Sequence, residues 1–311
     1  MSYIPKLNPT VGNGLGGLPE RKDNPVRGEI TFAIPGTYEW VVPENVKSIC
    51  AVVVGGGGGA TAGVGTNGSN VEAAGGGGGG GLAWTNEIVV RAGEKITITV
   101  PKGGSPANII ELVGNGGTGQ TAIVQRDSSS EILVRATGGE GGSRINSATN
   151  DGGIKSVGDG GGSGGSTITV SVTLTSFLVS GGGGTGGYSG TGGRGGASTN
   201  SLETRTPTAG TGGAGGGGYA NSAEGWSGGG VGLNGEGDSG AVNEGGSGGQ
   251  DSDTMNYYGA AIAVVFGAGG AASIRDYDGV QEAGSGSGGN GAVRIIWGAD
   301  RAFPSTDVGQ S

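Results

Sequence analysis

The sequence contains no histidine, a single cysteine and few charged residues, and these shortages exclude several kinds of function. Without His, the chain lacks the commonest general base and metal ligand. One Cys can form neither an intrachain disulfide nor a zinc-binding cluster. Cys50 lies in the apolar run 48–54, which predicts a buried, inert thiol. We therefore expect a non-catalytic protein without a cofactor or a metal.

Basic residues and long apolar runs are also scarce. The formal net charge of −9 argues against binding nucleic acid, which requires clustered Lys and Arg. No stretch approaches the roughly 20 apolar residues of a membrane-spanning helix. The N-terminus, MSYIPKLNPT, has neither the basic nor the apolar region of a signal peptide, so we expect assembly without secretory export.

Glycine is the residue in excess, with 82 of the 311 residues. Such a chain is either disordered or built from ordered glycine helices. Order is favoured, because only 14% of the residues are charged and strand-like runs separate the glycine blocks. Collagen fits poorly, since there are only 10 prolines and no Gly-X-Y register is filled with them.

One glycine block, GGGGTGGYSGTGGRGG over residues 181–196, repeats with a period of three. Three residues per turn is the repeat of a polyproline-II-type helix, which has no internal hydrogen bonds. We therefore predict that such helices stack and satisfy each other's amides. Bulky residues within the blocks, Tyr188 for example, should then face outward. The glycines of the register are Gly181, Gly184, Gly187, Gly190, Gly193 and Gly196.

The segments between the glycine blocks have strand patterns, and no stretch of useful length has a helical period. Residues 30–42 predict a β-hairpin with its turn at Pro35-Gly36, and the run 49–54 predicts a buried strand. We predict a sandwich core that includes Trp40, Ile49, Val52 and Trp84, joined by the C-terminal strand 292–297. The predicted fold class is all-β: a β-sandwich combined with a stacked polyglycine-II lattice, without significant α-helix.

The same patterns suggest how the chain is organised. Residues 1–28 carry four prolines and five glycines and predict an extended anchoring arm. A β-sandwich domain is expected over 29–104, completed by 292–297. A glycine-rich domain with exposed loops follows over 105–291, and a C-terminal tail over 298–311.

The loops that interrupt the glycine blocks carry aromatic residues among Asn, Ser and Arg. Exposed Tyr and Trp with small polar neighbours on a rigid scaffold are typical of a binding surface, and ordinary loops are the alternative. The candidate receptor contacts are Tyr219, Trp226, Tyr257, Tyr258 and Tyr277.

Two acidic motifs contain residue types that could bind calcium or catalyse hydrolysis. Residues 251–253 and 276–278 could each supply oxygen ligands to calcium, but both lack the later acidic ligands of an EF-hand loop. We expect solvated loop acids there, and whether calcium binds stays open. A glycosidase needs two carboxylates at a set separation, which sequence does not determine, so a carbohydrate-active enzyme remains a further alternative.

Four stretches carry a family resemblance: TFAIPGTYEWVVP at 31–43, VKSICAVVVGGGGG at 46–59, GGGGGGGLAW at 75–84 and VRAGEKITITV at 90–100. Together they resemble the glycine-rich domain of many phage structural proteins, over 29–104 and by composition to Trp297. The ending GAVRIIWG at 291–298, followed by RAFPST at 301–306, is similar to the ending of many virion proteins of cyanophages and other marine phages.

The alternating blocks also resemble the tip adhesins of long tail fibres in some T-even-type phages. Those adhesins are sandwiches of polyglycine II helices whose variable loops contact host receptors. This chain differs from them in its N-terminal β-domain and its Pro-rich arm.

The resemblance implies a virion structural protein, assembled in the host cytoplasm and displayed on the particle exterior. A tail-fibre or receptor-binding role is the leading expectation, with a capsid or tail decoration protein as the alternative. A secreted bacterial adhesin is a further reading. Expected partners are other virion proteins through residues 1–28, a host surface glycan or outer-membrane protein, and further copies of the chain.

Overall fold

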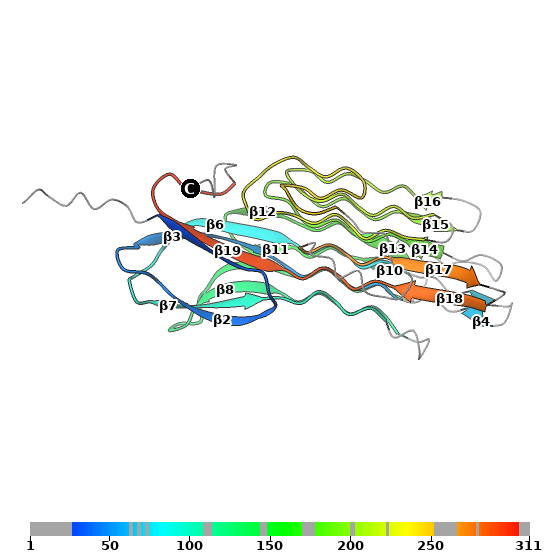
Figure 1. Cartoon of the computed structure of the whole chain (residues 1–311), viewed down its shortest axis with the longest axis horizontal. Helices are drawn as coiled ribbons and strands as arrows, with labels where there is room; N and C mark the ends of the chain where they lie inside the picture. Colours follow the sequence, from blue (N-terminus) through cyan, green and yellow to red (C-terminus); the bar gives the residue numbers. More distant parts are fainter. Residues whose placement is uncertain are drawn as a thin grey trace, which may run out of the picture.

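Two five-stranded antiparallel sheets form one end of the molecule, and glycine-rich segments extend from them to the other end (Figure 1). The first sheet has the order β1 (Gly28–Phe32), β19 (Ala292–Trp297), β3 (Ser48–Val54), β6 (Leu82–Val89), β12 (Gly160–Gly162). The second has the order β11 (Lys155–Val157), β9 (Ile132–Ala136), β8 (Ala122–Arg126), β7 (Lys95–Val100), β2 (Gly36–Val41). The computed structural model describes residues 27–61, 65–66, 70–71, 75–107, 114–143, 148–169, 178–199, 203–221, 224–251, 266–277 and 280–304.

The predicted hairpin over residues 30–42 is wrong. Strand β1 pairs with β19 and strand β2 pairs with β7, so residues 33–35 carry the chain from one sheet to the other. The alternating apolar residues of both strands still face each other, with the rings of Phe32 and Tyr38 5.1 Å apart. Alternation defines which face is apolar but not which strand supplies the hydrogen bonds, and here the partners are distant in sequence.

The two sheets draw on more of the chain than the predicted sandwich domain. Strands β8, β9, β11 and β12 all lie beyond residue 104, where the sandwich was expected to end. The prediction that strand 292–297 joins the sandwich is confirmed, because β19 lies between β1 and β3.

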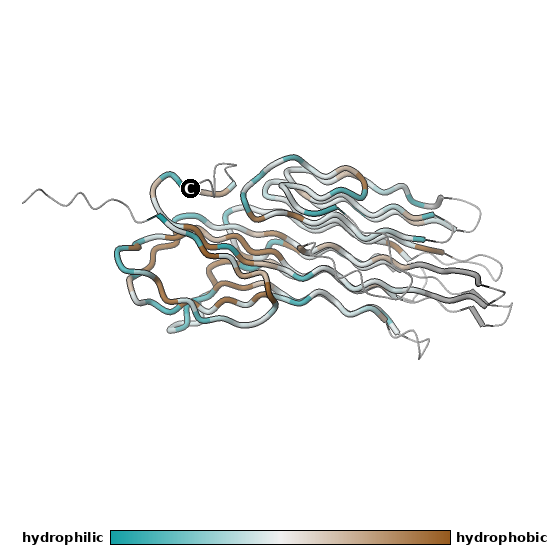
Figure 2. The backbone as a smooth tube through the Cα atoms, in the orientation of Figure 1, coloured by the Kyte–Doolittle hydropathy of each residue, from teal (hydrophilic) through white to brown (hydrophobic). Residues whose placement is uncertain are grey.

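The hydrophobic core lies between the two sheets. Trp40 and Ile49 belong to it, as predicted, whereas Val52 and Trp84 lie on the opposite face of the first sheet. Figure 2 shows the apolar residues gathered in the sandwich and the glycine segments nearly neutral in hydropathy. Further members of this core include Val53, Ile96, Ile98, Val124, Val134, Val293 and Ile295.

Strand β3 is buried on both faces, which explains its continuous apolar run. Ile49 and Val53 face the inter-sheet core, while Cys50 and Val52 face a second cluster with Leu82. That cluster is closed by side chains from outside the sheets, Tyr188, Val231, Leu233 and Phe303. The prediction that Cys50 is buried is confirmed, and burial raises the pKa of its thiol.

Most strands of the sandwich continue directly into glycine segments, as from β3 into 55–61 and from 75–81 into β6 (Figure 1). We call these segments the glycine lattice. They have neither helical nor strand hydrogen bonding and bond instead to one another. The described segments of the lattice are 55–61, 75–81, 101–107, 114–120, 137–143, 151–154, 163–166, 181–187, 191–196, 206–211, 214–218, 227–232, 267–270 and 286–291.

The hydrogen bonds of segment 181–187 show the three-residue repeat. The N–H groups of Gly181, Gly184 and Gly187 donate to segment 190–196. Those of residues 182 and 185 donate to 226–229, and those of 183 and 186 donate to 77–80. Its carbonyl groups accept from 165, 215–218 and 269. One segment thus has six bonded neighbours, because a helix with three residues per turn presents its amides in three directions. This confirms the predicted stack, but residues 181–196 do not form a single helix: the chain bends at 188–190, and the two arms of the block bond to each other.

The period-three register follows from the same geometry. A Cβ atom on Gly181, Gly184 or Gly187 would lie closer than 3.0 Å to the carbonyl oxygen of residue 218, 215 or 212 respectively. Gly190 and Gly193 face residues 211 and 208 of the adjoining segment 206–211, and Gly196 faces Pro207. The register is therefore the face along which the two arms of block 181–196 contact residues 206–218.

Tyr188 corrects the expectation that bulky residues of the blocks face outward. Its side chain is fully buried, stacks on Phe303 with ring centres 5.9 Å apart, and donates to the Gly232 carbonyl at 3.1 Å. Segment 181–187 ends beside the sandwich, so Tyr188 meets the outer face of the first sheet rather than solvent. Arg194 and Tyr219 are exposed, and Trp226 is half-buried.

Candidate binding surfaces of the glycine lattice

Short antiparallel strand pairs close the lattice at the end opposite the sandwich, which we call the distal end (Figure 1). The described chain enters and leaves at the sandwich end, since Gly28 of β1 pairs with Trp297 of β19. The distal strands are β4 (Gly65–Thr66), β5 (Asn70–Val71), β10 (Ala148–Asn150), β13 (Thr167–Thr169), β14 (Leu178–Ser180), β15 (Ala197–Thr199), β16 (Glu203–Arg205), β17 (Ala272–Tyr277) and β18 (Val280–Ser285).

Two of the predicted contact residues, Tyr219 and Trp226, are brought together by a tight turn. The Trp226 N–H donates to the Tyr219 carbonyl at 2.9 Å, and the Glu224 N–H donates to Oδ1 of Asn221 at 2.7 Å. The rings lie 5.5 Å apart, tilted by 53°. Tyr219 is 37% exposed. Together they form a partly exposed aromatic pair that presents ring faces and polar edges, a combination suited to sugars or to a protein surface.

Small residues hold this turn against the distal end of the lattice. Ala220 is buried with Ala60, Val179 and Ala272. Gly225 lies so close to the carbonyl oxygens of Ala272 and residue 180 that a Cβ atom would come within 3.0 Å of both. The aromatic pair is therefore mounted on a rigid base.

The other predicted contacts are not placed beside this pair. Tyr257 and Tyr258 lie outside the described residues. Tyr277 ends strand β17, where its backbone pairs with Val280, and its side chain lies outside the described part of the chain. The aromatic surface that the structure shows thus consists of Tyr219 and Trp226.

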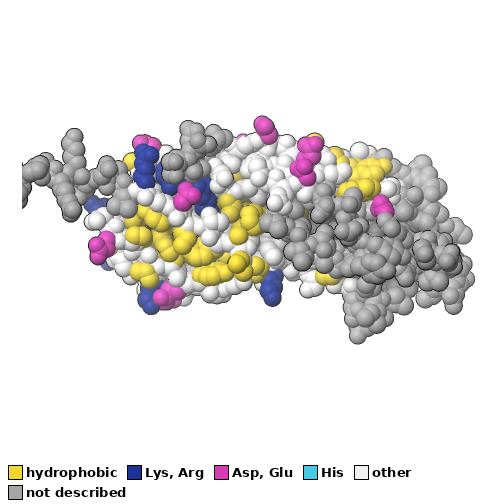
Figure 3. Space-filling view, viewed as in Figure 1, with side chains coloured by type: hydrophobic (Ala, Val, Ile, Leu, Met, Phe, Trp, Pro, Cys, Tyr) yellow, Lys and Arg dark blue, Asp and Glu magenta, His cyan; other side chains and the backbone are white. Residues whose placement is uncertain are grey.

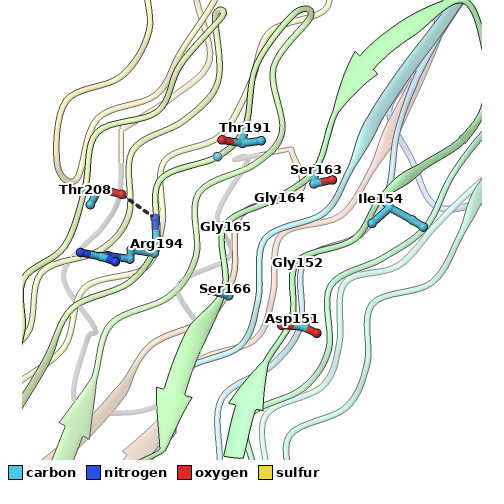
Figure 4. Close-up of a pocket in the computed structure, with 11 residues that line it drawn as sticks. Asp151, Gly152, Ile154, Ser163, Gly164, Gly165, Ser166, Thr191, Arg194 and Thr208 are labelled. Atoms are coloured by element: carbon cyan, nitrogen blue, oxygen red, sulfur yellow. Dashed lines mark hydrogen bonds between the residues drawn. The ribbon is translucent and has the colours of Figure 1, made fainter.

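A groove along the side of the lattice was not predicted from the sequence. It has a volume of about 580 Å³ and runs between segments 151–154 and 191–194, with segment 163–166 as its floor (Figure 4). Ser166 Oγ accepts from Arg205 at 3.2 Å, and burial, followed by the charge of Arg194, lowers the pKa of Arg205. The signal in the sequence was the pair Ser163 and Ser166, spaced by three inside a glycine block.

Potential metal ligands are dispersed among the described residues. Among them, no three His, Cys, Asp or Glu side chains are grouped so that they could hold a metal ion. Of the two acidic motifs, Asp251 accepts from the Gly245 N–H at 3.1 Å, whereas Asp253 and Asp278 lie outside the described residues. On the face shown in Figure 3, the described charged side chains are scattered rather than clustered. No helix in the described part of the chain has the length and hydropathy to cross a membrane.

The architecture defines a class of protein: a β-sandwich whose strands continue into a lattice of glycine helices. A family model of the glycine-rich domain matches residues 31–298, and the chain belongs to this family. The match extends over both the sandwich and the lattice, in agreement with the glycine-rich domain expected over 29–104 and by composition to Trp297. No curated protein matches the chain.

Proposed function

We propose that this protein is a non-catalytic structural component of a bacteriophage virion, displayed on the particle exterior as a tail-fibre or receptor-binding protein. The observation that carries the proposal is the polarity of the molecule. The described chain enters and leaves at the sandwich end, and the short strand pairs gather at the far end of the lattice (Figure 1).

This polarity suits a protein that attaches at one end and binds at the other. Residues 1–28 would anchor the sandwich end to other virion proteins, since they contain too little apolar material to fold alone. The distal loops would contact a host surface glycan or outer-membrane protein. Tyr219 and Trp226 are the proposed contact residues that lie in the described part of the chain. The lattice between them holds the loops rigidly, and we expect the protein to act as a homo-oligomer.

The experiment uses the phage that carries the gene. Tyr219→Ala and Trp226→Ala, together, should leave particle assembly intact and reduce host adsorption, because they remove the aromatic faces but not the base of the turn. The matched control is Tyr38→Ala with Glu39→Ala in β2, at the sandwich end, which should not change adsorption by intact particles. Particle composition is measured by mass spectrometry in every case.

Three outcomes count against the proposal or a part of it. Normal adsorption by the aromatic variant would remove the receptor-binding role, and hundreds of copies per particle would favour a decoration protein. Absence of the protein from purified particles would overturn the virion role itself. Deleting residues 1–28 should yield a folded protein that is missing from particles, which tests the anchor separately.

A further inference from the structure

One side of the sandwich, which we call the open edge, ends in two regular edge strands. In the described chain, β1 pairs only with β19 and β2 only with β7. Neither pairing has a shift in register, and neither strand contains Lys or Pro. Folded proteins usually protect a sheet edge with Lys, Pro, a bulge or a covering segment, because an exposed edge invites another strand. Within the described residues, the open edge has none of these protections.

The opposite side of the sandwich is protected. It ends in β11 and β12, which have three residues each. The register of β11 on β9 shifts between Lys155 and Val157, and Lys155 is exposed. Beside β12, a Cβ atom on Gly162 would overlap the carbonyl oxygen of Gly190, so a neighbouring segment covers this strand. The two sides of the sandwich therefore differ in whether another strand can be added.

The alternation of hydrogen bonds across the first sheet shows which backbone groups of β1 point outward. The Gly55 N–H donates to the Gly81 carbonyl, so odd-numbered residues of β3 bond to β6 and even-numbered ones to β19. Carried across β19, the same alternation leaves the N–H and C=O groups of Glu29 and Thr31 at the open edge. These groups have no hydrogen-bond partner among the described residues.

Strand β2 offers a second row of free backbone groups. The Val42 N–H donates to the Glu94 carbonyl, so even-numbered residues of β2 bond to β7. The backbone groups of Thr37, Glu39 and Val41 therefore point outward. They too have no partner in the part of the chain that the structure describes.

Apolar side chains accompany the two rows. Phe32 of β1 and Tyr38 of β2 are half-buried, and their rings lie 5.1 Å apart. This contact places the two rows on the same side of the sandwich and sets these two residues at the same height along the strands. Ile34, between the strands, is 74% exposed, and Val41 is 49% exposed. Figure 3 shows apolar side chains gathered on the sandwich part of the face that it draws.

We propose that a second copy of this chain covers the open edge, with β1 of each copy pairing antiparallel to β2 of the other. A twofold axis parallel to the strands brings these edges together, because β1 and β2 run in opposite directions on the two sheets. Since Phe32 and Tyr38 are level, Thr31 then lies opposite Glu39 of the second copy. Both sheets would continue from one copy into the other.

The two rows complement each other in hydrogen bonding, charge and packing. Outward-pointing residues meet only outward-pointing residues, so each facing pair can exchange two hydrogen bonds. Glu29 lies opposite Val41 of the second copy, so no two carboxylates face each other directly, and Glu29 and Glu39 are each already paired with a basic side chain. Phe32 of one copy lies beside Tyr38 of the other, which makes the two cores continuous.

The orientation of the two copies rests on the proposed function, whereas the association itself does not. The strands run roughly along the long axis of the molecule (Figure 1). A twofold axis parallel to them keeps both distal ends at the same end of the dimer, as binding at one end requires. Pairing of β1 with β1 would instead point the distal ends in opposite directions, and it is the alternative outcome of the test.

Analytical ultracentrifugation of the purified full-length protein tests the association. We expect a dimer at micromolar concentration. Val41→Glu should weaken it about tenfold or more, because the new carboxylate would face Glu29 of the second copy. Val89→Glu is the matched control, since Val89 is 71% exposed but lies on β6, away from the open edge, and should leave the dimer unchanged. Thermal melting confirms that both variants fold.

Engineered disulfides test the register and the orientation. Thr31→Cys with Glu39→Cys should give a covalent dimer, because these side chains face each other between copies but point to opposite faces of the sandwich within one copy. Thr31→Cys with Thr37→Cys, displaced by two residues along β2, should cross-link at least about tenfold less. The native Cys50 is buried and should not compete.

Three results would overturn the proposal. A monomeric natural protein at micromolar concentration, or a Val41→Glu variant that dimerises as well as the natural protein, would remove the interface. Cross-linking by Ile30→Cys alone, at the centre of a β1–β1 pair, would show the opposed orientation instead.

These failures are distinct from a failure of the virion role, which adsorption measures. Adsorption does not require the pairing, since each copy carries its own aromatic pair at the distal end. Particles with Tyr38→Ala and Glu39→Ala therefore still serve as the adsorption control.

Discussion

At the scale of single residues, glycine is required here because it has no Cβ atom. In segments 55–61, 75–81 and 181–187 the backbones approach so closely that a Cβ atom at every glycine except Gly75 would overlap neighbouring backbone atoms. Backbone cannot move aside as a flexible side chain can. The glycine content is therefore a steric requirement of the lattice, even though glycine loses more conformational entropy on folding than any other residue.

Gly184→Ala should consequently destabilise the protein. Its Cβ atom would meet the carbonyls of residues 215 and 216, and we expect the free energy of unfolding to fall by about 1–3 kcal/mol or more. Gly36→Ala is the matched control, because its nearest neighbours would be atoms of Tyr38 at an ordinary 3.5 Å. Denaturant unfolding measures both. Equal stability of the two variants would show that the lattice yields easily.

A second residue-scale feature is the buried charge of Arg294 on strand β19. Its side chain is 3% exposed, donates to the Leu233 carbonyl at 3.1 Å and pairs with Glu29 at 2.6 Å. Glu29 also binds Arg301. The guanidinium of Arg301, and then that of Arg294, hold the pKa of Glu29 below its ordinary value of 4.5. This carboxylate therefore stabilises the fold above the pKa of the unfolded chain, and the stabilisation is lost as the pH falls through the lowered pKa.

Glu29→Gln should lower the free energy of unfolding near neutral pH by about 1–3 kcal/mol. We expect the lower end of this range, because Glu29 is 41% exposed and solvent screens its charge. The deficit relative to the natural protein should shrink as the pH falls into the acid range. Glu39→Gln is the control, since its pair with Lys95 is half exposed at both ends and should matter little at any pH. Melting curves at several pH values measure both, and a deficit independent of pH would contradict the role of the charge.

At the scale of elements, the last strand of the chain is central to the first sheet. Strand β19 pairs with β1 and β3, and Val293, Ile295 and Ile296 are fully buried. Burying one such side chain contributes roughly 1.5–3 kcal/mol, and β1 would lose its partner in the sheet as well.

A chain that ends before Ala292 should therefore fail to fold and should be recovered as insoluble protein. A chain that ends after Pro304 is the control and should remain soluble, because it keeps β19 and the contact of Phe303 with Tyr188. Expression, solubility and thermal melting distinguish the two. A soluble, cooperatively melting short form would show that β1 and β3 can pair without β19.

At the scale of the whole molecule, the sandwich and the lattice share the same chain segments. Because β3 continues into 55–61 and 75–81 into β6, unravelling one part removes the covalent anchor of the other. Tyr188 and Leu233 add packing between the two parts. They should therefore unfold together.

We expect a single unfolding transition by calorimetry and by tryptophan fluorescence. Ile98→Ala in the sandwich and Gly184→Ala in the lattice should each lower its midpoint without splitting it. The first leaves a cavity that costs about 2–5 kcal/mol, and the second introduces the clash described above. Two separate transitions, each moved by only one of the variants, would show that the parts fold independently.

The sequence by itself determined the fold class and the chemistry of the lattice. A glycine every third residue indicates a helix with three residues per turn, and strand 292–297 is too apolar to remain solvated; both inferences depend on local patterns. The burial of Cys50 followed in the same way from the apolar run around it.

Only the tertiary structure decided which strands pair, on which face of the first sheet Val52 lies, and whether Tyr188 is buried. It also decided where the lattice has its groove. Alternation specifies two faces of a strand but not its partner, so the hairpin over 30–42 was mistaken. Tyr188 is buried because segment 181–187 ends against the sandwich, a contact between residues far apart in sequence. The groove likewise depends on how many neighbours surround segment 163–166, and that number is a property of the assembled lattice, in which helices bond to segments distant in the sequence.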